Sequence, residues 1–450
     1  MKNKIYNILK IISIVIFLHS NAQSTDQFIF DVTEVEILEN GNLFKGLKKG
    51  IIKTNDGIII NANTFEYNKS LNILKAKGNV KIEDTIKQYS IFSDDITYLK
   101  NEEIISTKGN SKVIDHLKNQ IINSDILIHD KFKNTFQAKG NAKIEDTIKQ
   151  YSIFSDIIFY QKNIQKIFTE GPTEANIQSK YNFKSKNVVF LKDKQKLSSK
   201  NKTIIKDQNL NVYHLDKFSY LIDKEELKGD NIIIISNFGL PNNEKVYFSN
   251  AIINFKKQNS IAKDTKIQIA KNAFGNENND PRLYGASSQK NNQIKEIKKG
   301  VFTSCKKNDD CPPWSIKASE IVHDKKEKKL TYKNALLKIY DIPVLYFPRF
   351  FHPDPTVKRQ SGILQPKINS SNVLGSSVNI PYYHVLSDNK DLTFSPTFFD
   401  GDLDMWQGEY RQQNKKSSLM ANFGLTTNYK SSSQKEKKIL HIFFQNLMLI

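Results

Sequence analysis

Acidic and amide side chains recur along this chain at a fixed spacing of 31 residues. Asp94, Asp125 and Asp156 keep this spacing, with Asn63 before them and Asn187 after them. A ladder of carboxylates is one way to bind calcium, but no D-x-D or G-G-x-G-x-D pattern is present to supply further ligands. The alternative is that each residue occupies a turn or a strand edge. We favour this second interpretation and predict no metal site.

The two cysteines, Cys305 and Cys311, are the other candidates for chemistry. Their C-x5-C spacing matches no zinc or redox motif, and the eight histidines include no H-E-x-x-H pair. The chain also lacks a G-x-S-x-G elbow, a Walker loop and a dinucleotide fingerprint. We therefore predict a protein that is not an enzyme, with no catalytic residues and no cofactor.

The elements that position these residues are repeats. AKGNVKIEDTIKQYSIFSD at 76–94 returns as AKGNAKIEDTIKQYSIFSD at 138–156, and a diverged copy lies at 107–125. Polar and apolar residues alternate in each copy as in β-strands, with Val80 and Ile82 on one side. The Lys-Gly-Asn triplet suits a bulge or a tight bend at a strand corner. A period of this size indicates one supersecondary unit that buries its apolar face against neighbouring copies.

The same alternation continues beyond the repeats. From about residue 31 to residue 269 the sequence predicts one strand after another, and strands resume near residue 303 after a loop rich in Asn, Lys and Gln at 273–299. The spacing fits an all-β protein. A sandwich, a jelly roll and a solenoid all remain open at this point.

The N-terminus has the features of a secretory signal. Lysines precede an apolar run from Ile11 to Leu18, and a small-x-small site ends at Ala22, which predicts a signal peptide over 1–22. The run is too short to span a membrane as a helix. The formal charge of +20 is spread along the chain, as an A/T-rich genome would produce, and it remains compatible with an anionic partner. We predict no nucleic acid partner for an exported chain.

Six motifs occur in order toward the end of the chain: FTSC at 302–305, WSIKASEIVHD at 314–324, PVLYFP at 343–348, HPDPTVKRQSGIL at 352–364, IPYY at 380–383 and DLTFSPTF at 391–398. On these motifs, the stretch from Pro343 to Asp400 resembles the start of the outer-membrane barrel of the LptD family of lipopolysaccharide-assembly proteins. The upstream repeats look like the family's periplasmic jelly-roll domain. The resemblance implies a signal peptide over 1–22, a periplasmic OstA-like jelly roll over 23–350 with its clearest repeats near 47–187, and a barrel portion over 351–450.

The resemblance also implies a function, which is lipopolysaccharide transport and assembly at the outer membrane. In this family the jelly roll carries acyl chains in a groove between two sheets, so Val80, Ile82, Ala142 and Ile144 are candidates to line it. The residues alone leave open a closed core in the same place. Implied partners are lipopolysaccharide, an LptA-type periplasmic bridge protein that adds to a sheet edge, and an LptE-type lipoprotein plug.

Two further sets of residues follow from the resemblance. Prolines at the places of Pro366 and Pro381 weaken the seam through which lipid leaves the family's barrel, because proline removes a donor from the strand ladder. Family members join cysteines of the N-terminal domain to cysteines near the end of the barrel, and the barrel portion here has none. We therefore predict a local bond between Cys305 and Cys311.

The barrel portion is expected to be incomplete. About 90 residues follow the junction, enough for about six to eight strands, and the last residues, ILHIFFQNLMLI, differ from an aromatic final strand. A frameshift or a truncated gene model is the expected reason. Two alternatives remain: a soluble jelly roll of the periplasmic bridge, and a parallel β-helix enzyme acting on polysaccharide.

Overall fold

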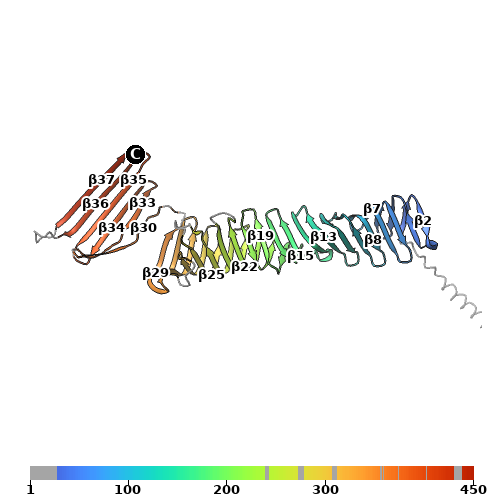
Figure 1. The fold of residues 1–450 in the computed structure, drawn as a ribbon, viewed down its shortest axis with the longest axis horizontal. Coiled ribbons are helices and arrows are strands. Elements are labelled where there is room, and N and C mark those ends of the chain that lie inside the picture. The colour runs from blue at the N-terminus through green and yellow to red at the C-terminus, as the bar shows by residue number, and fades with distance from the viewer. Residues whose placement is uncertain are drawn as a thin grey trace, which may run out of the picture. The chain divides into compact units, whose positions relative to one another are not determined.

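The computed structural model describes residues 28–238, 243–271, 278–306, 312–354, 357, 359–372, 374–401, 403–429 and 438–449. The predicted signal peptide over 1–22 lies outside these residues. The described chain is all-β, as predicted, with strands joined by short turns and two 3-10 helices (Figure 1). No helix of the described residues has the length and apolar character needed to span a bilayer.

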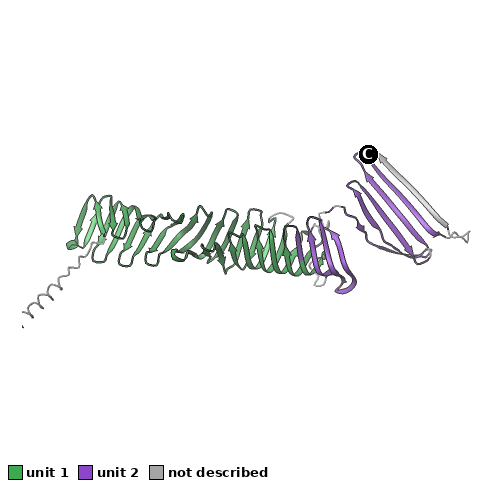
Figure 2. Cartoon of the chain, turned by 180° about the vertical axis from the view of Figure 1, so that it is seen from behind, with its two compact units in different colours: residues 1–270, 280–292, 297–315 green, residues 271–279, 293–296, 316–450 purple. Residues whose placement is uncertain are grey.

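The chain divides into two compact units (Figure 2). Unit 1 comprises residues 1–270, 280–292 and 297–315, and unit 2 comprises residues 271–279, 293–296 and 316–450. The predicted domain boundary at 350/351 stays a prediction.

Unit 1 contains the strands from β1 to β25 and most of β26, and these strands are short at first and longer in the repeats. They are β1 (Phe28–Val32), β2 (Val35–Leu38), β3 (Leu43–Gly46), β4 (Gly50–Thr54), β5 (Ile58–Ala62), β6 (Thr64–Asn68), β7 (Ile73–Asp84), β8 (Tyr89–Leu99), β9 (Ile104–Lys108), β10 (Ser111–Asp115), β11 (Gln120–Ser124), β12 (Ile126–Asp130), β13 (Thr135–Asp146), β14 (Tyr151–Gln161), β15 (Lys166–Ile177), β16 (Tyr181–Lys186), β17 (Val189–Leu191), β18 (Lys196–Ser199), β19 (Thr203–Asp207), β20 (Val212–Leu215), β21 (Lys217–Leu221), β22 (Glu226–Ser236), β23 (Glu244–Asn254), β24 (Asn259–Gln268), β25 (Arg282–Lys290) and β26 (Ile294–Thr303), with 3-10 helices at Glu39–Gly41 and Lys162–Ile164.

Each long strand of unit 1 belongs to two facing sheets. The first half of β7 pairs with β6 and its second half pairs with β5, and the register shifts by one bulge between Lys77 and Val80. β13 repeats this arrangement with β12 and β11. We call the sheet that contains β5, β10 and β11 the first sheet, and the sheet that contains β6, β9 and β12 the second sheet. The edge where strands bend from one to the other is the bend edge.

The glycine that repeats every 31 residues makes the bend. Gly109 has a φ of +84°, which favours glycine, and a Cβ placed on it would lie 2.4 Å from the Asp94 carboxylate. The Asp94 backbone N–H donates to the Gly109 carbonyl at 3.1 Å, and the Asn110 amide donates to the Asp94 carboxylate at 2.9 Å. The periodic aspartates therefore occupy the bend of the strand, as the turn or strand-edge interpretation predicted.

Neighbouring strands pair antiparallel in the repeats, between β22 and β23, and between β34 (Lys390–Phe399) and β35 (Asp404–Gln413), so the described chain is not a parallel β-helix. The alternative of a β-helix enzyme is therefore wrong in its fold. The two sheets of unit 1 enclose one continuous apolar core that runs from Phe28 to Ala262.

Unit 2 contains two groups of strands. The first group is β27 (Trp314–Asp324), β28 (Lys329–Ile339) and β29 (Ile342–Pro353), and the second is an eight-stranded antiparallel sheet of β30 (Gly362–Ile363), β31 (Lys367–Ser371), β32 (Gly375–Asn379), β33 (Tyr382–Ser387), β34 (Lys390–Phe399), β35 (Asp404–Gln413), β36 (Ser417–Tyr429) and β37 (Lys438–Leu449).

Candidate functional site: the groove between the two sheets

An aliphatic row lies in the middle of the first sheet and faces the second. Its residues are direct cross-strand neighbours, and we call them the apolar row: Ile60, Ile82, Ile91, Val113, Ile122, Ile144 and Ile153. All are buried. The predicted groove residues Ile82 and Ile144 belong to this row, with no exposed surface.

Small side chains lie next to the bend edge, on the same face. The predicted groove residues Val80 and Ala142 pair with Ser93 and Ser155, and all four are buried. The Ser155 hydroxyl donates to the Pro172 carbonyl at 2.9 Å. Small residues leave room for the two sheets to meet at the bend.

A row of polar residues lies on the opposite side of the apolar row, where the hairpin turns of both sheets meet. We call this open edge the mouth, and the polar row comprises Asp84, Tyr89, Asp115, Gln120, Asp146 and Tyr151, which are also direct cross-strand neighbours. All six are buried. The Asp84 carboxylate accepts hydrogen bonds from the backbone of Ile86 and Lys87, and Asp115 and Asp146 do the same in their own turns.

Aromatic side chains of the second sheet face the polar row at the mouth. These side chains recur about every 31 residues: Tyr67, Tyr98, His129, Tyr160, Phe190 and Tyr220. The cross-strand neighbours between them are aliphatic except Phe136, which lies between His129 and Tyr160. Tyr89 of the polar row contacts His129 edge-on, with ring centroids 5.0 Å apart, and Tyr151 contacts Phe190 at 4.8 Å. The interior thus changes from small, to aliphatic, to aromatic and polar between the bend edge and the mouth.

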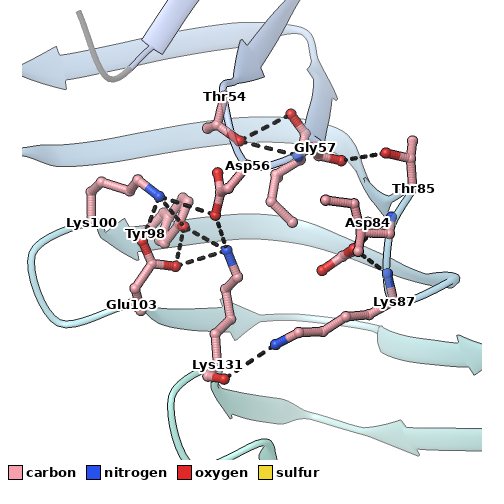
Figure 3. Close-up of polar contacts among 12 residues, drawn as sticks. Thr54, Asp56, Gly57, Asp84, Thr85, Lys87, Tyr98, Lys100, Glu103 and Lys131 are labelled. Atoms are coloured by element: carbon pink, nitrogen blue, oxygen red, sulfur yellow. Dashed lines mark hydrogen bonds and ion pairs between the residues drawn. The ribbon is translucent and has the colours of Figure 1, made fainter. Parts of the chain in front are cut away.

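Ion pairs join the two sheets across the mouth at its N-terminal end (Figure 3). The Lys131 ammonium lies 2.6 Å from the Asp56 carboxylate and 2.7 Å from that of Glu103. Lys100 contacts the same two carboxylates, and the Tyr98 hydroxyl donates to Glu103 at 2.7 Å. Burial opposes ionisation of Asp56, but the hydrogen bond and charge of Lys131 hold its pKa well below its usual range. We call these four charged residues the ionic cluster.

Lysines follow the aromatic residues in successive turns, and their partners change along the mouth. Lys162 lies 2.9 Å from the Asp115 carboxylate and 5.5 Å from the centre of the Tyr89 ring. Lys192 is also buried and lies 5.2 Å from the centre of the Tyr160 ring. Burial lowers the pKa of Lys192 to about 8, and the nearby charges of Asp146 and Asp115 offset only part of this effect.

An outer groove of about 1170 Å³ lies at the bend edge of the same unit. Apolar side chains such as Phe154 and Ile204 line it together with Lys186, Lys202 and a Lys184–Glu174 ion pair of 3.4 Å. Of the four predicted groove residues, Ala142 alone is among its lining residues. This outer groove differs from the space between the two sheets because charged residues lie among the apolar ones throughout its lining.

The two predicted gate prolines lie at breaks in the first hairpin of the eight-stranded sheet. Pro366 lies between β30 and β31, and Pro381 lies between β32 and β33. The register changes across the break from Ile363↔Tyr382 to Lys367↔Asn379, so three residues oppose two. The Leu364 N–H donates to the Pro381 carbonyl at 2.8 Å, which is the hydrogen bond that crosses the break.

The eight-stranded sheet has one polar and one apolar face along β34. Asp391, Thr393 and Thr397 share one face, and the exposed Phe394 and Phe398 share the other. The neighbours of these phenylalanines continue the apolar face, since Tyr382 pairs with Phe394 and Val378 with Phe398. Such alternation is typical of strands with lipid on one side.

Sequence reasoning missed a polar cluster on the other face of this sheet. The Arg359 guanidinium contacts the Asp391 carboxylate and donates to the Tyr383 hydroxyl at 3.0 Å, and Arg411 lies 2.8 Å from the same carboxylate. Arg359 belongs to HPDPTVKRQSGIL and Asp391 to DLTFSPTF, so the charged residues of these two motifs could have indicated an ion pair. The cluster fixes the segment before β30 to three later strands.

The predicted disulfide stays a prediction, because Cys311 lies outside the described residues. Cys305 is partly buried, and its thiol donates to the Trp314 carbonyl at 3.7 Å. Among the described residues there is no group of three or more His, Cys, Asp or Glu placed to hold a metal.

No protein-family model matches the chain. It is similar to LPS-assembly protein LptD of Hahella chejuensis, with 40% identity over 110 residues, and to LptD of Yersinia pestis, with 36% identity over 115 residues. LptD of Legionella pneumophila strain Paris is 35% identical over 127 residues. These matches cover 24–28% of this chain and 13–15% of the relatives' length. The resemblance to the LptD family is confirmed over about a quarter of the chain.

Proposed function

We propose that this chain takes part in lipopolysaccharide transport and assembly at the outer membrane, as an LptD-like protein. Unit 1 is the periplasmic part that receives the lipid, and the eight-stranded sheet belongs to the outer membrane. The likeness to the LptD relatives supports the assignment of the process, and the two faces of β34 support a place in lipid.

The graded interior of unit 1 is the observation that carries the proposal. An amphiphile needs an apolar site for its chain and a polar site for its headgroup, and the apolar row and the mouth are arranged in that order. Burial of an acyl chain contributes about 0.8 kcal/mol per methylene group, so a row that spans several repeats holds a chain without a covalent step. We infer that acyl chains lie along the apolar row, with the headgroup at the mouth.

The described structure is the closed state of this groove. The apolar-row side chains pack against the second sheet with almost no exposed surface, so an acyl chain enters only when the two sheets separate at the mouth. The bend edge keeps the sheets covalently joined during this movement. Opening therefore breaks the ionic cluster and the Lys162–Asp115 pair.

Partners follow from the same proposal. An LptA-type jelly roll would add its edge strand to the N-terminal end of unit 1 by backbone pairing, and an LptE-type lipoprotein would fill the barrel to which the eight-stranded sheet contributes. The break at Pro366 and Pro381 would serve as the lateral exit for lipid. In a full-length relative, replacing both matching prolines by alanine is expected to slow the appearance of labelled lipopolysaccharide at the cell surface, and unchanged kinetics would reject the exit.

Site-specific crosslinking in cells tests the groove directly. A photoreactive residue at Ile82 or Ile144 is expected to crosslink to lipopolysaccharide. The matched controls are Lys81 and Lys143, which adjoin these residues in the same strands but face outward. Equal crosslinking from inward and outward positions, or none from either, would reject lipid binding between the sheets. A soluble jelly roll of the bridge, the second candidate, would give the inward crosslinks but would be recovered without the outer membrane.

A further inference from the structure

Three tyrosines of the second sheet make the same kind of hydrogen bond at the mouth. The Tyr67 hydroxyl donates to Asn72 at 2.9 Å, the Tyr98 hydroxyl to Glu103 at 2.7 Å, and the Tyr160 hydroxyl to Gln165 at 3.4 Å. In each case the acceptor lies five residues after the tyrosine. The acceptor residue is in the turn that follows the tyrosine, and its backbone has a positive φ of 48–54°.

Three of the aromatic positions of the second sheet lack this bond: Phe190 has no hydroxyl, the Tyr220 hydroxyl has no hydrogen-bond partner among the described residues, and His129 stands in place of a tyrosine between the Tyr98 and Tyr160 repeats. The residue five positions after His129 is Asn134, which has the same backbone conformation, with a φ of 53°. The buried Oδ1 of Asn134 has no hydrogen-bond partner, and neither ring nitrogen of His129 has one. An imidazole is shorter than a phenol, so the histidine leaves unfilled the place where the hydroxyls of Tyr67, Tyr98 and Tyr160 lie in their own repeats.

The surroundings of His129 keep these polar atoms buried. The ring stacks on Phe136 with centroids 4.0 Å apart, and Tyr89 covers it edge-on from the first sheet. Burial, reinforced by the charges of Lys87, Lys162 and Lys131, lowers the pKa of His129 well below its usual value. The imidazole is therefore neutral, with one N–H donor and one acceptor nitrogen.

The hydrogen-bond donors and acceptors of His129 and Asn134 determine which functional group they can bind. Asn134 Oδ1 requires a donor, because the Asn134 amide nitrogen already donates to Asn163 at 2.8 Å. His129 offers both a donor and an acceptor. A hydroxyl group satisfies Asn134 and His129 together, since it donates one hydrogen bond and accepts another. A carbonyl or a carboxylate would leave Asn134 unsatisfied.

We propose that His129 and Asn134 form a hydroxyl-binding subsite at the mouth of the groove, which recognises a hydroxyl group near the polar end of a bound acyl chain. This inference rests on the proposed function of unit 1 as an amphiphile-binding groove, and it names a chemical feature of the cargo. The apolar row holds the acyl chain, and its hydroxyl takes the place that the Tyr67, Tyr98 and Tyr160 hydroxyls take in their repeats.

The test compares two fatty acids that differ by one hydroxyl group. The dissociation constants of 3-hydroxytetradecanoate and tetradecanoate are measured by calorimetry on the full chain held in an amphipathic polymer. Wild-type protein is expected to prefer the hydroxylated acid about five-fold, the effect of one to two net hydrogen bonds. In His129→Tyr the protein's own hydroxyl fills the subsite, so the ratio of the two constants is expected to fall to about one and the melting temperature to rise.

A second variant introduces a histidine at another tyrosine position. It is expected to keep or raise the preference, so a loss caused only by poor folding can be told apart. Tyr160→His removes the hydroxyl that Gln165 accepts and is expected to retain or increase the preference for the hydroxylated acid. A ratio of one in the wild type would mean that the gap holds water only, and a preference unchanged in His129→Tyr would place recognition elsewhere. Either result overturns the subsite alone. Failure of both acids to bind would overturn the proposed function together with it.

Discussion

The two halves of the mouth are built differently over the same apolar interior. Between Asp56 and Gln165 the sheets meet through carboxylates and lysines that range from buried to partly exposed, centred on the ionic cluster. Between Ile177 and Gln258 they meet mainly through aromatic rings: Tyr181 stacks on Phe255 at 5.0 Å, and Tyr213 contacts the same ring at 5.5 Å. The contacts that close the mouth therefore differ between the two halves, whereas the apolar interior beneath them is the same.

The difference shows which property each half depends on. Ion pairs depend on charge, so acid or a competing ion weakens them, whereas aromatic contacts depend on buried area and respond to neither. A charged headgroup can compete for the lysines of the first half, but it has few partners in the second, where the rim carries the Lys180–Glu225 pair. Under the proposed function, the first half is therefore the part of the mouth that a charged headgroup would open.

Removing a central ring from the aromatic half is expected to have the largest effect. Tyr220 is fully buried and contacts Phe183 at 5.2 Å and Tyr181 at 5.7 Å. Tyr220→Ala should lower the free energy of unfolding by about 3–5 kcal/mol through lost burial and a new cavity. Denaturant titration measures it. A loss under about 1 kcal/mol would show that the aromatic contacts do not hold this half closed.

Breaking the ionic cluster is expected to cost less, because Asp56 is about two-fifths exposed. Lys131→Met leaves the carboxylates of Asp56 and Glu103 with Lys100 alone and should destabilise the protein by about 2 kcal/mol. The control is Lys75→Met, which removes an exposed 3.1 Å pair with Glu66 and should change stability by less than about 0.5 kcal/mol. Equal effects of the two variants would contradict a special role for the cluster.

Replacing Lys192, the lysine at the corresponding position in the aromatic half, should stabilise the protein, whereas replacing Lys131 should destabilise it. The pKa of Lys192 is lowered to about 8, so the folded protein binds this proton more weakly than the unfolded chain does. Stability should then rise with pH between about 8 and 10.5, and Lys192→Met should stabilise the protein at pH 7 by about 1–2 kcal/mol. Thermal unfolding of both proteins at pH 7 and pH 10 checks this, since the gain should shrink at the higher pH.

Acid is expected to have the smallest of these effects and to act on the first half. Since the pKa values of Asp56 and Glu103 are lowered on folding, their contribution is present above the unfolded values near 4 and is lost as the pH falls below them. With solvent screening the loss is about 1 kcal/mol. The hydrogen-exchange protection factors of the Asp56 and Lys131 turns, which divide out the intrinsic exchange rate at each pH, should fall between pH 5 and pH 3, while those of the turns near Tyr220 stay constant. An equal fall in protection at both places would contradict the comparison.

The sequence predicted the interior better than the mouth. Strand alternation placed Ile82 and Ile144 on an inward face, and the glycine period located the bends, because both signals are local in the chain. The ionic cluster joins Lys131 to Asp56 across 75 positions, and no periodic pattern indicates such a contact. Asp84, Asp115 and Asp146 look like ordinary turn residues because they are turn residues, and their burial in the polar row depends on the facing sheet.

The bends that join the two sheets decide how the groove moves. Because each long strand passes through both sheets without interruption, the sheets cannot slide past one another, and the bend edge acts as a hinge line that leaves rotation as the available motion. Neighbouring repeats share backbone hydrogen bonds on both sides of this line, so the opening of one repeat strains the next. A cargo that advances along the groove would therefore travel as a local widening, with repeats closing behind it as others open ahead.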